Sequence, residues 1–281
     1  MTHFADHARS FRAQLVANQL IAQDTRKLRI TVPAMEAAPG QFFMVRNPAT
    51  NDPLIGRALA MYDIRSDEQG SQSLELVYLV KGKLTTSLAK LPPGSEIAVW
   101  GPLGNGFTPT NSDHLIMVAG GVGQTPFLSL GKEALGQQHY GRRKSGYARR
   151  VSLCYGARTK GYLAGVEDFA QAGIDVHVAT EDGSLGTQGR VTVVLEKLLQ
   201  ESVAAEAIQV VCCGPEPMMQ AVAQIASYRN VPCQVSLETP MACGIGICFT
   251  CVARIGTAQD WDYKRTCVEG PVFDAGHVQW S

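Results

Sequence analysis

Near its C-terminus the chain reads Cys243-Gly-Ile-Gly-Ile-Cys248-Phe-Thr-Cys251, and Cys267 follows after fifteen further residues. The spacing C-x4-C-x2-C, with a fourth cysteine downstream, is typical of the thiolate ligands of a plant-type [2Fe–2S] cluster. A regular helix or strand cannot turn three side chains toward one small object within nine residues. The pattern therefore predicts an irregular loop that wraps around a metal centre.

Two glycines, Gly244 and Gly246, lie between the first two cysteines. They permit the backbone conformations that such a loop needs, and they let N–H groups approach the sulfurs. A structural zinc site is an alternative, since zinc also binds four thiolates. Disulfides are the other alternative, and they are rare in proteins of the cytosol.

The composition is that of a globular protein. The chain has 281 residues, 45% of them hydrophobic and 18% charged, with a formal net charge of zero. Its length is enough for two domains of ordinary size. Zero net charge argues against a large nucleic-acid footprint. We expect no secretory leader in Met1–His7, no membrane span and a cytoplasmic location.

The first part of the chain, to about residue 107, contains short strand-like runs separated by Gly, Pro, Asn and Asp. The regular spacing of these runs predicts an antiparallel barrel or sandwich, and one short helix is expected at Thr85–Leu91. The expected strands are Lys27–Val32, Gln41–Arg46, Ala58–Ile64, Leu74–Val80 and Ser95–Val99.

The middle of the chain alternates apolar strands with helices, which predicts a parallel sheet with helices on both faces. The expected strands are Leu115–Ala119, Val151–Tyr155, Ile174–Ala179, Ile208–Cys213 and Gln234–Leu237. The expected helices are Pro126–Leu135, Val166–Ala172, Thr192–Glu201 and Pro217–Tyr228. Regular structure is expected to stop after Leu237, where the cysteine loop begins.

Two strand-to-helix turns are candidate nucleotide sites, because open α/β sheets bind ligands at the carboxyl ends of their strands. The first contains Gly120, Gly121, Gly123, Gln124 and Thr125, and Pro126 starts the helix. Its exposed N–H groups could hold a pyrophosphate. The second contains Cys213, Gly214 and Pro215 and should lie at the same edge of the sheet. Either could also be a plain turn.

Four further cysteines, Cys154, Cys212, Cys213 and Cys233, lie in apolar runs. They are expected to be small buried hydrophobes, with Cys213 the candidate for a place beside a nicotinamide.

Three other segments are candidates for anion contacts. Arg57 could pair with a cofactor phosphate, and Lys81–Ser87 offers hydroxyls at a possible helix start. A basic cluster is either a solvated connection or a contact to a partner or to cofactor phosphates; it comprises Arg142, Arg143, Lys144, Arg149 and Arg150. The stretch Gly101–Phe107 can be read as a plain rigid linker.

In this order the segments resemble the ferredoxin-reductase superfamily. Three stretches are similar, more narrowly, to the electron-transfer subunits of class 1B dihydroorotate dehydrogenases, over about residues 12–275. These stretches are Met241–Cys251, Tyr263–Phe273 and Gly101–Phe107.

The resemblance implies a β-barrel FAD-binding domain at 1–108, an α/β NAD-binding domain at 109–238 and a [2Fe–2S] subdomain at 239–281. It places flavin contacts on Arg57, Ala58, Leu59, Ala60, Tyr78, Leu79, Val80, Leu84, Thr85 and Thr86. The chain departs from the family's R-P-x-S motif at Ala58 and Ala60, and from its G-T contact at Leu84. The bulk of Leu84 is expected to move the phosphate contact to Thr85 and Thr86.

The resemblance also implies an electron relay in which FAD lies between NAD and the cluster. The partner would be a catalytic, FMN-type dehydrogenase subunit in a hetero-oligomer, a heterotetramer in the family. This chain has no eight-fold βα pattern that could house dihydroorotate chemistry. Trp261, Tyr263 and Phe273 are either anchors for this partner or core residues under the loop.

Glu181 and Asp182 follow the third α/β strand and favour NADH over NADPH, because an acid there binds ribose hydroxyls. Arg158 and Lys160 favour the opposite. Two other functions stay open. One is the reductase component of another assembly, such as a ferredoxin:NADP⁺ oxidoreductase, a glutamate-synthase-like complex or an oxygenase system. The other is a zinc-stapled binding module without flavin.

Overall fold

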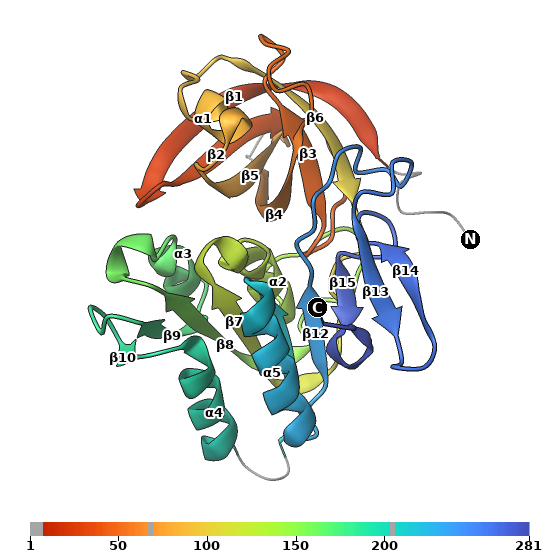
Figure 1. Cartoon of the computed structure of the whole chain (residues 1–281). Helices are drawn as coiled ribbons and strands as arrows, with labels where there is room; N and C mark the ends of the chain where they lie inside the picture. Colours follow the sequence, from red (N-terminus) through yellow and green to blue (C-terminus); the bar gives the residue numbers. More distant parts are fainter. Residues whose placement is uncertain (1–7, 67–69, 203–205, 281) are drawn as a thin grey trace.

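In the computed structural model the chain forms a β-barrel, an α/β sheet and a C-terminal cysteine loop with a hairpin (Figure 1). The structure describes residues 8–66, 70–202 and 206–280. The N-terminal stretch in which no leader is expected therefore lies outside the described residues. No helix among the described residues is long and apolar enough to cross a membrane.

The barrel is closed by six antiparallel strands in the order β1-β2-β5-β4-β3-β6. Their bounds are β1 (Arg9–Ala22), β2 (Thr25–Val32), β3 (Phe42–Arg46), β4 (Arg57–Ser66), β5 (Gln72–Leu79) and β6 (Glu96–Leu103). Five of them match expected strands. β1 is not among the expected strands, because its largely exposed residues give a weak apolar signal. Yet β1 closes the barrel, pairing first with β6 and then with β2.

Alternation along the barrel strands gives each of them two different faces. On β3, Phe43 and Val45 point into the barrel core, whereas Phe42 and Met44 belong to a separate apolar cluster outside it. The short helix α1 (Lys83–Ala89) adds its leucines to the barrel core. The outer wall formed by β3 and β6 is thus apolar and needs a cover.

The α/β part is a seven-stranded sheet in the order β10-β9-β8-β7-β11-β12-β15. Six strands are parallel: β7 (Ser112–Gly120), β8 (Ala148–Ala157), β9 (Asp175–Thr180), β10 (Thr187–Gln188), β11 (Ile208–Cys213) and β12 (Cys233–Ser236). The helices are α2 (Phe127–Ala134), α3 (Val166–Gln171), α4 (Val191–Glu201) and α5 (Glu216–Tyr228).

Helices cover both faces of this sheet, as expected. Leu115 and Met117 of β7 pack with α2 and α3, whereas Ile116 and Val118 pack with α4 and α5. A strand buried on both faces reads as one continuous apolar run, which is why β7 could be recognised from the sequence.

The expectation that regular structure stops after Leu237 is wrong. The C-terminal part contains the hairpin β13 (Val252–Gly256) and β14 (Trp261–Arg265), and the strand β15 (Val272–Asp274). β15 pairs antiparallel with β12 at the edge of the α/β sheet. Its three residues are too short to give a strand pattern, and only pairing with a preformed edge makes them a strand.

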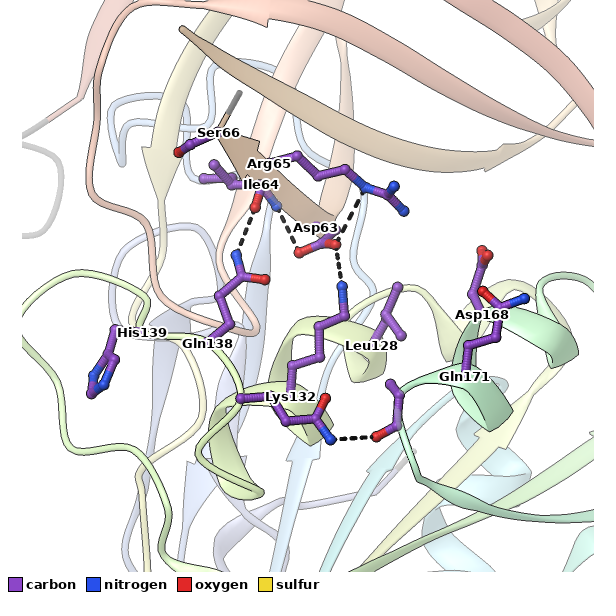
Figure 2. A pocket seen from close by; sticks show the side chains of 12 residues that line it. Asp63, Ile64, Arg65, Ser66, Leu128, Lys132, Gln138, His139, Asp168 and Gln171 are labelled. Carbon is purple, nitrogen blue, oxygen red and sulfur yellow. Dashed lines mark hydrogen bonds and ion pairs between the residues drawn. The ribbon is translucent and has the colours of Figure 1, made fainter. Parts of the chain in front are cut away.

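The barrel and the α/β part meet at a polar interface that lines an open cavity of about 640 Å³. Figure 2 shows the ammonium of Lys132 on α2 reaching the buried carboxylate of Asp63 on β4, 2.5 Å away. At another side of the cavity, Asp168 of α3 accepts hydrogen bonds from Lys27 and Tyr62 of the barrel, at 2.9 and 2.8 Å. These contacts fix the two parts relative to each other.

The substitution Lys132→Met should destabilise the protein by about 3 kcal/mol, because it leaves the Asp63 carboxylate buried without its main cationic partner. The matched control is Lys197→Met, which removes an exposed pair with Glu201 and should change the stability by less than about 0.5 kcal/mol. Chemical denaturation of both variants measures this, and equal losses would contradict it.

His114 is a buried histidine in the middle of the sheet, and its Nε2 lies 2.8 Å from the hydroxyl of Ser152. Burial, and then the nearby charge of Arg150, lower the pKa of His114 to about 4. The unfolded chain therefore binds a proton at His114 between pH 6.5 and 4 that the folded chain does not. Stability from this group is complete above pH 6.5 and is lost as the pH falls.

We therefore expect the wild type to lose about 2 kcal/mol more stability between pH 8 and pH 5 than the variant His114→Gln, which cannot titrate. Urea unfolding of both proteins at the two pH values measures the difference. Parallel losses would show that His114 does not carry this pH dependence.

Candidate functional site

The four cysteines of the loop lie together, in a buried pair and a more exposed pair. The sulfurs of Cys251 and Cys267 are 3.2 Å apart, and each residue is 1% exposed. Cys243 is half-buried, Cys248 is exposed, and the two are close enough to interact. No three acidic, His or Cys side chains of the described residues already surround a single point. Two pairs of thiols suit a [2Fe–2S] cluster, because each of its two irons binds two cysteines.

Cys248 of the exposed pair and Cys267 of the buried pair have pKa values shifted in opposite directions. Hydrogen bonds from Thr250, and then from Cys243, lower the pKa of Cys248 to about 6. Burial, and then the neighbouring Cys251, raise the pKa of Cys267 to about 12. Metal binding requires thiolates. Cys248 therefore favours the ligating form, whereas Cys267 needs a nearby positive charge to ionise.

The loop bends where glycine is required. Gly244 and Gly246 have φ of +73° and +83°, and a Cβ on Gly244 would lie 2.7 Å from Met44 of β3. The N–H of Ile245 points at the Cys243 sulfur, 3.4 Å away. Arg265 donates to the Gly246 carbonyl at 3.1 Å and so closes the loop from the hairpin.

The apolar cover of the barrel wall is this loop. Cys251, Cys267 and Val268 pack in one cluster with barrel residues, and Ala58 of β4 lies at its margin. The barrel members are Phe42, Met44, Leu103 and, partly buried, Trp100. A predicted flavin contact and two predicted cluster ligands thus share one patch of packing.

The stretch Gly101–Phe107 is more than a plain linker, which corrects that expectation. Asn105 makes four hydrogen bonds to the segment that follows Cys267: its backbone and side-chain N–H groups reach the carbonyls of Gly270, Glu269 and Val272, and its Oδ1 accepts from the Val272 N–H. A Cβ at Gly104 would lie 2.5 Å from Pro271. Sequence reasoning missed the role of Asn105, which only its distant partner segment reveals.

The predicted flavin residues of β4 are consecutive and partly accessible to solvent. Arg57 is exposed and donates to its neighbour Gly56 at 3.1 Å, and no acidic side chain of the described residues pairs with it. Ala58, Leu59 and Ala60 are half-buried. An unpaired guanidinium next to a row of small and apolar side chains fits the phosphate and ring of a flavin.

The other predicted flavin residues divide by side-chain direction. Tyr78 is buried in the barrel core, where its hydroxyl donates to Asn18 at 3.1 Å, whereas Leu79 and Val80 are half-buried. Leu84 is 1% exposed in the same core. Its bulk therefore does not cover the backbone, and the expected displacement of the phosphate contact has no steric basis.

The hydroxyl of Thr85 accepts from the N–H groups of Lys81 and Gly82, both at 3.0 Å. Thr86, the next residue, is exposed. Of the two predicted hydroxyl contacts, Thr86 is therefore the freer to meet a phosphate.

The two glycine-containing turns of the sheet lie side by side, as expected, because Cys213 of β11 pairs with Ala119 of β7. A Cβ at Gly123 would lie 2.3 Å from the Cys213 carbonyl oxygen. A Cβ at Gly121, where φ is +55°, would meet no described atom within 4 Å. The first turn thus packs closely against the second turn at Gly123, and it leaves space at Gly121. Space beside a glycine backbone fits a pyrophosphate.

The remaining residues of these turns differ in accessibility. Gly120 is half-buried and contacts Met218, whereas Gln124 and Thr125 are buried. Gly214, with φ of +155°, packs tightly on Gly120, and Pro215 caps α5.

The thiol of Cys213, the candidate for a place beside a nicotinamide, is buried. Burial, and then the charge of Glu238, raise the pKa of Cys213 to about 12. Its thiol is therefore neutral at physiological pH. Cys154, Cys212 and Cys233 are buried in the core, as expected.

The loops after β8 and β9 also meet at the carboxyl edge of the sheet. The N–H of Asp182 donates to the Arg158 carbonyl at 3.2 Å, and that of Lys160 donates to Ser184 at 2.8 Å. The guanidinium of Arg158 lies over Tyr162, 4.9 Å from the ring centroid. Acidic and basic side chains are thus both present where the adenosine end of a dinucleotide would bind.

The basic cluster cannot contact cofactor phosphates at these turns. Arg149 and Arg150 lie at the start of β8, at the opposite edge of the sheet, and pair with Asp113 and Glu206. The other members contact Glu36, Phe107, Glu133 and Asn111. Of the alternatives, a solvated connection and a contact to a partner both stay predictions, and the cluster's side chains are in addition paired with neighbouring groups of the chain.

Two of the three expected aromatic anchors are exposed: Trp261 is 40% and Tyr263 56% exposed, and their rings form a T-shaped pair. Phe273 instead packs against the core of the α/β sheet. The loop itself presents Ile245, Ile247 and Phe249, which are 40, 74 and 60% exposed. An apolar surface therefore surrounds the exposed cysteine.

Three domain families match the chain in succession. They are an oxidoreductase FAD-binding domain over residues 12–107, an oxidoreductase NAD-binding domain over 117–224, and the iron-sulfur cluster binding domain of dihydroorotate dehydrogenase B over 238–279. The matches agree with the barrel, the sheet and the cysteine loop.

Similar proteins agree with these matches. The electron transfer subunit of dihydroorotate dehydrogenase B (NAD(+)) from Geobacillus kaustophilus is 37% identical over 95% of this chain and 97% of its own. That from Desulforamulus reducens is 34% identical over 96 and 98%. A chain in the structure of the NADH-dependent reduced ferredoxin-NADP oxidoreductase superposes with a TM-score of 0.79, at 29% identity over 95% of this chain and 90% of that one. The chain thus belongs to the family of dihydroorotate dehydrogenase B electron transfer subunits, oxidoreductase components with FAD-, NAD- and iron–sulfur-binding domains.

Proposed function

We propose that this chain passes electrons between NAD(H) and a catalytic flavin subunit on which dihydroorotate is oxidised. When bound, FAD exchanges two electrons with the nicotinamide and single electrons with a [2Fe–2S] cluster. The observation that carries the proposal is the shared packing of Ala58 with Cys251 and Cys267. This packing brings the proposed flavin-binding strand next to two of the proposed cluster ligands.

The proposed roles follow the three segments 1–108, 109–238 and 239–281. Arg57, Ala58, Leu59, Ala60, Leu79 and Val80 hold the flavin, with Tyr78 and Leu84 supporting them from the core and Thr85 and Thr86 near its phosphates. Gly120, Gly121, Gly123, Gln124, Thr125, Cys213, Gly214 and Pro215 hold the nicotinamide dinucleotide. Cys243, Cys248, Cys251 and Cys267 ligate the cluster.

The apolar surface around Cys248 is the proposed docking face for the partner. Its exposed apolar residues are Ile247 and Phe249 in the loop, and Tyr263 and Trp261 in the hairpin that follows the loop. Exposed apolar patches of this kind mark interaction sites, and Cys248 is the ligand nearest to solvent. Electrons would enter or leave by the shortest route here. We propose an FMN-type partner, a hetero-oligomeric assembly and a cytoplasmic location.

A second candidate has one specific observation in its favour. The structural similarity to the ferredoxin-NADP oxidoreductase chain extends over nearly the whole length. A reductase component of such an assembly would use the same relay with another partner. The substrate of the subunit that co-purifies with this chain distinguishes the two.

NADH should reduce the bound flavin at concentrations at least about tenfold lower than NADPH, because Asp182 disfavours a 2′-phosphate. Asp182→Asn should narrow this preference. Anaerobic titration of the purified holoprotein, followed by flavin absorbance, measures both effects. A preference for NADPH would contradict the assignment, and a colourless protein with one zinc ion would overturn the relay altogether.

The double substitution Trp261→Ala, Tyr263→Ala should weaken binding of the partner by at least about tenfold, since exposed aromatics often dominate interfaces. The control is Tyr228→Ala, which removes an 84% exposed tyrosine on α5. Co-purification with the catalytic subunit from the native cells measures binding. Equal recovery with both variants would exclude the hairpin from the docking face.

A further inference from the structure

Trp100 is a single side chain that touches both the predicted flavin strand and the predicted cluster loop. Its indole Nε1 donates a hydrogen bond to the carbonyl of Cys243, 2.9 Å away. The far edge of its ring lies against Gly56, where an added Cβ would be 2.7 Å from the ring carbon Cη2. Gly56 directly precedes Arg57, the first residue of the flavin motif.

The barrel sets this direction. Alternation along β6 sends Ile97 and Val99 into the barrel core, so that Trp100 points outward. There it pairs with Met44 of β3 and packs on the apolar wall that the cysteine loop covers. Because its backbone lies in a closed sheet, the side chain has little freedom to follow a moving loop.

The hydrogen bond acts on a predicted ligand. The Cys243 carbonyl belongs to a half-buried residue, and no second donor to this carbonyl is found among the described residues. Groups that hold a ligand in place orient it and influence the affinity and potential of the metal centre. An indole is also rigid, so contact at both of its ends fixes the distance between Gly56 and the Cys243 carbonyl.

We propose that Trp100 is a positioning residue for electron transfer: it holds the Cys243 end of the cluster loop at a fixed place relative to the flavin-binding strand. This inference rests on the proposed function. A tryptophan with a role in packing alone would be replaced adequately by another aromatic ring, whereas the proposed role needs the N–H group as well.

The test is Trp100→Phe in the holoprotein, which keeps a ring and removes the donor. The control is Trp280→Phe, which changes a partly buried tryptophan that packs against the core of the α/β sheet and is not part of the apolar cluster of the cysteine loop. In Trp100→Phe we expect release of iron to a chelator to become about tenfold faster. We also expect a shifted EPR signal of the reduced cluster and a slower appearance of that signal after mixing with NADH. Reduction of the flavin by NADH should be unchanged, and the control should match the wild type.

The inference would be overturned if Trp100→Phe released iron, gave an EPR signal and reduced its cluster as the wild type does. The proposed relay would then stay intact. A wild type that binds neither flavin nor cluster would instead overturn the proposed function. If Trp100→Phe does not fold, Trp100→His, which keeps a ring N–H, is compared with Trp100→Leu. Better cluster retention in the histidine variant supports the inference, and equal retention overturns it.

Discussion

Packing between the cysteine loop and the outer wall of the barrel is the interaction on which the rest of this molecule depends. Cys251, Cys267 and Val268 cover Phe42 and Met44, which alternation directs away from the barrel core. Without the loop this wall would be exposed apolar surface, and without the wall the loop would have no core. The two segments therefore stabilise each other although about two hundred residues separate them along the chain.

The same packing decides how acidity and metal binding are coupled. Burying Cys267 beside Cys251 raises the pKa of the Cys267 thiol, so this thiol resists ionisation unless a cation compensates. Cys248, at the surface, has a lowered pKa and is the more reactive thiol. The positions of the four cysteines therefore decide three properties together. These are the stability of the loop, the access to the cluster and the surface available to a partner.

A separate set of contacts holds the nicotinamide-binding part. Lys132 and Asp168 join the α/β part to the barrel through charged pairs, away from the apolar wall. β15 ties the C-terminal segment to the sheet by pairing with β12. The three parts thus contact one another pairwise, and the position of the α/β part relative to the barrel is fixed by polar contacts that have specific geometry.

The sequence by itself determined the features that local patterns encode: the cysteine spacing, the doubly buried strands of the sheet, the two glycine turns and most of the barrel strands. It could not reveal β1, whose exposed residues carry little apolar signal, nor β15, which becomes a strand only beside β12. Only the tertiary structure placed Leu84 in the core, the basic cluster at the far edge of the sheet, and Asn105 and Trp100 against the cysteine loop. Their roles depend on partners distant in the chain, and such contacts leave no trace in the residues on either side.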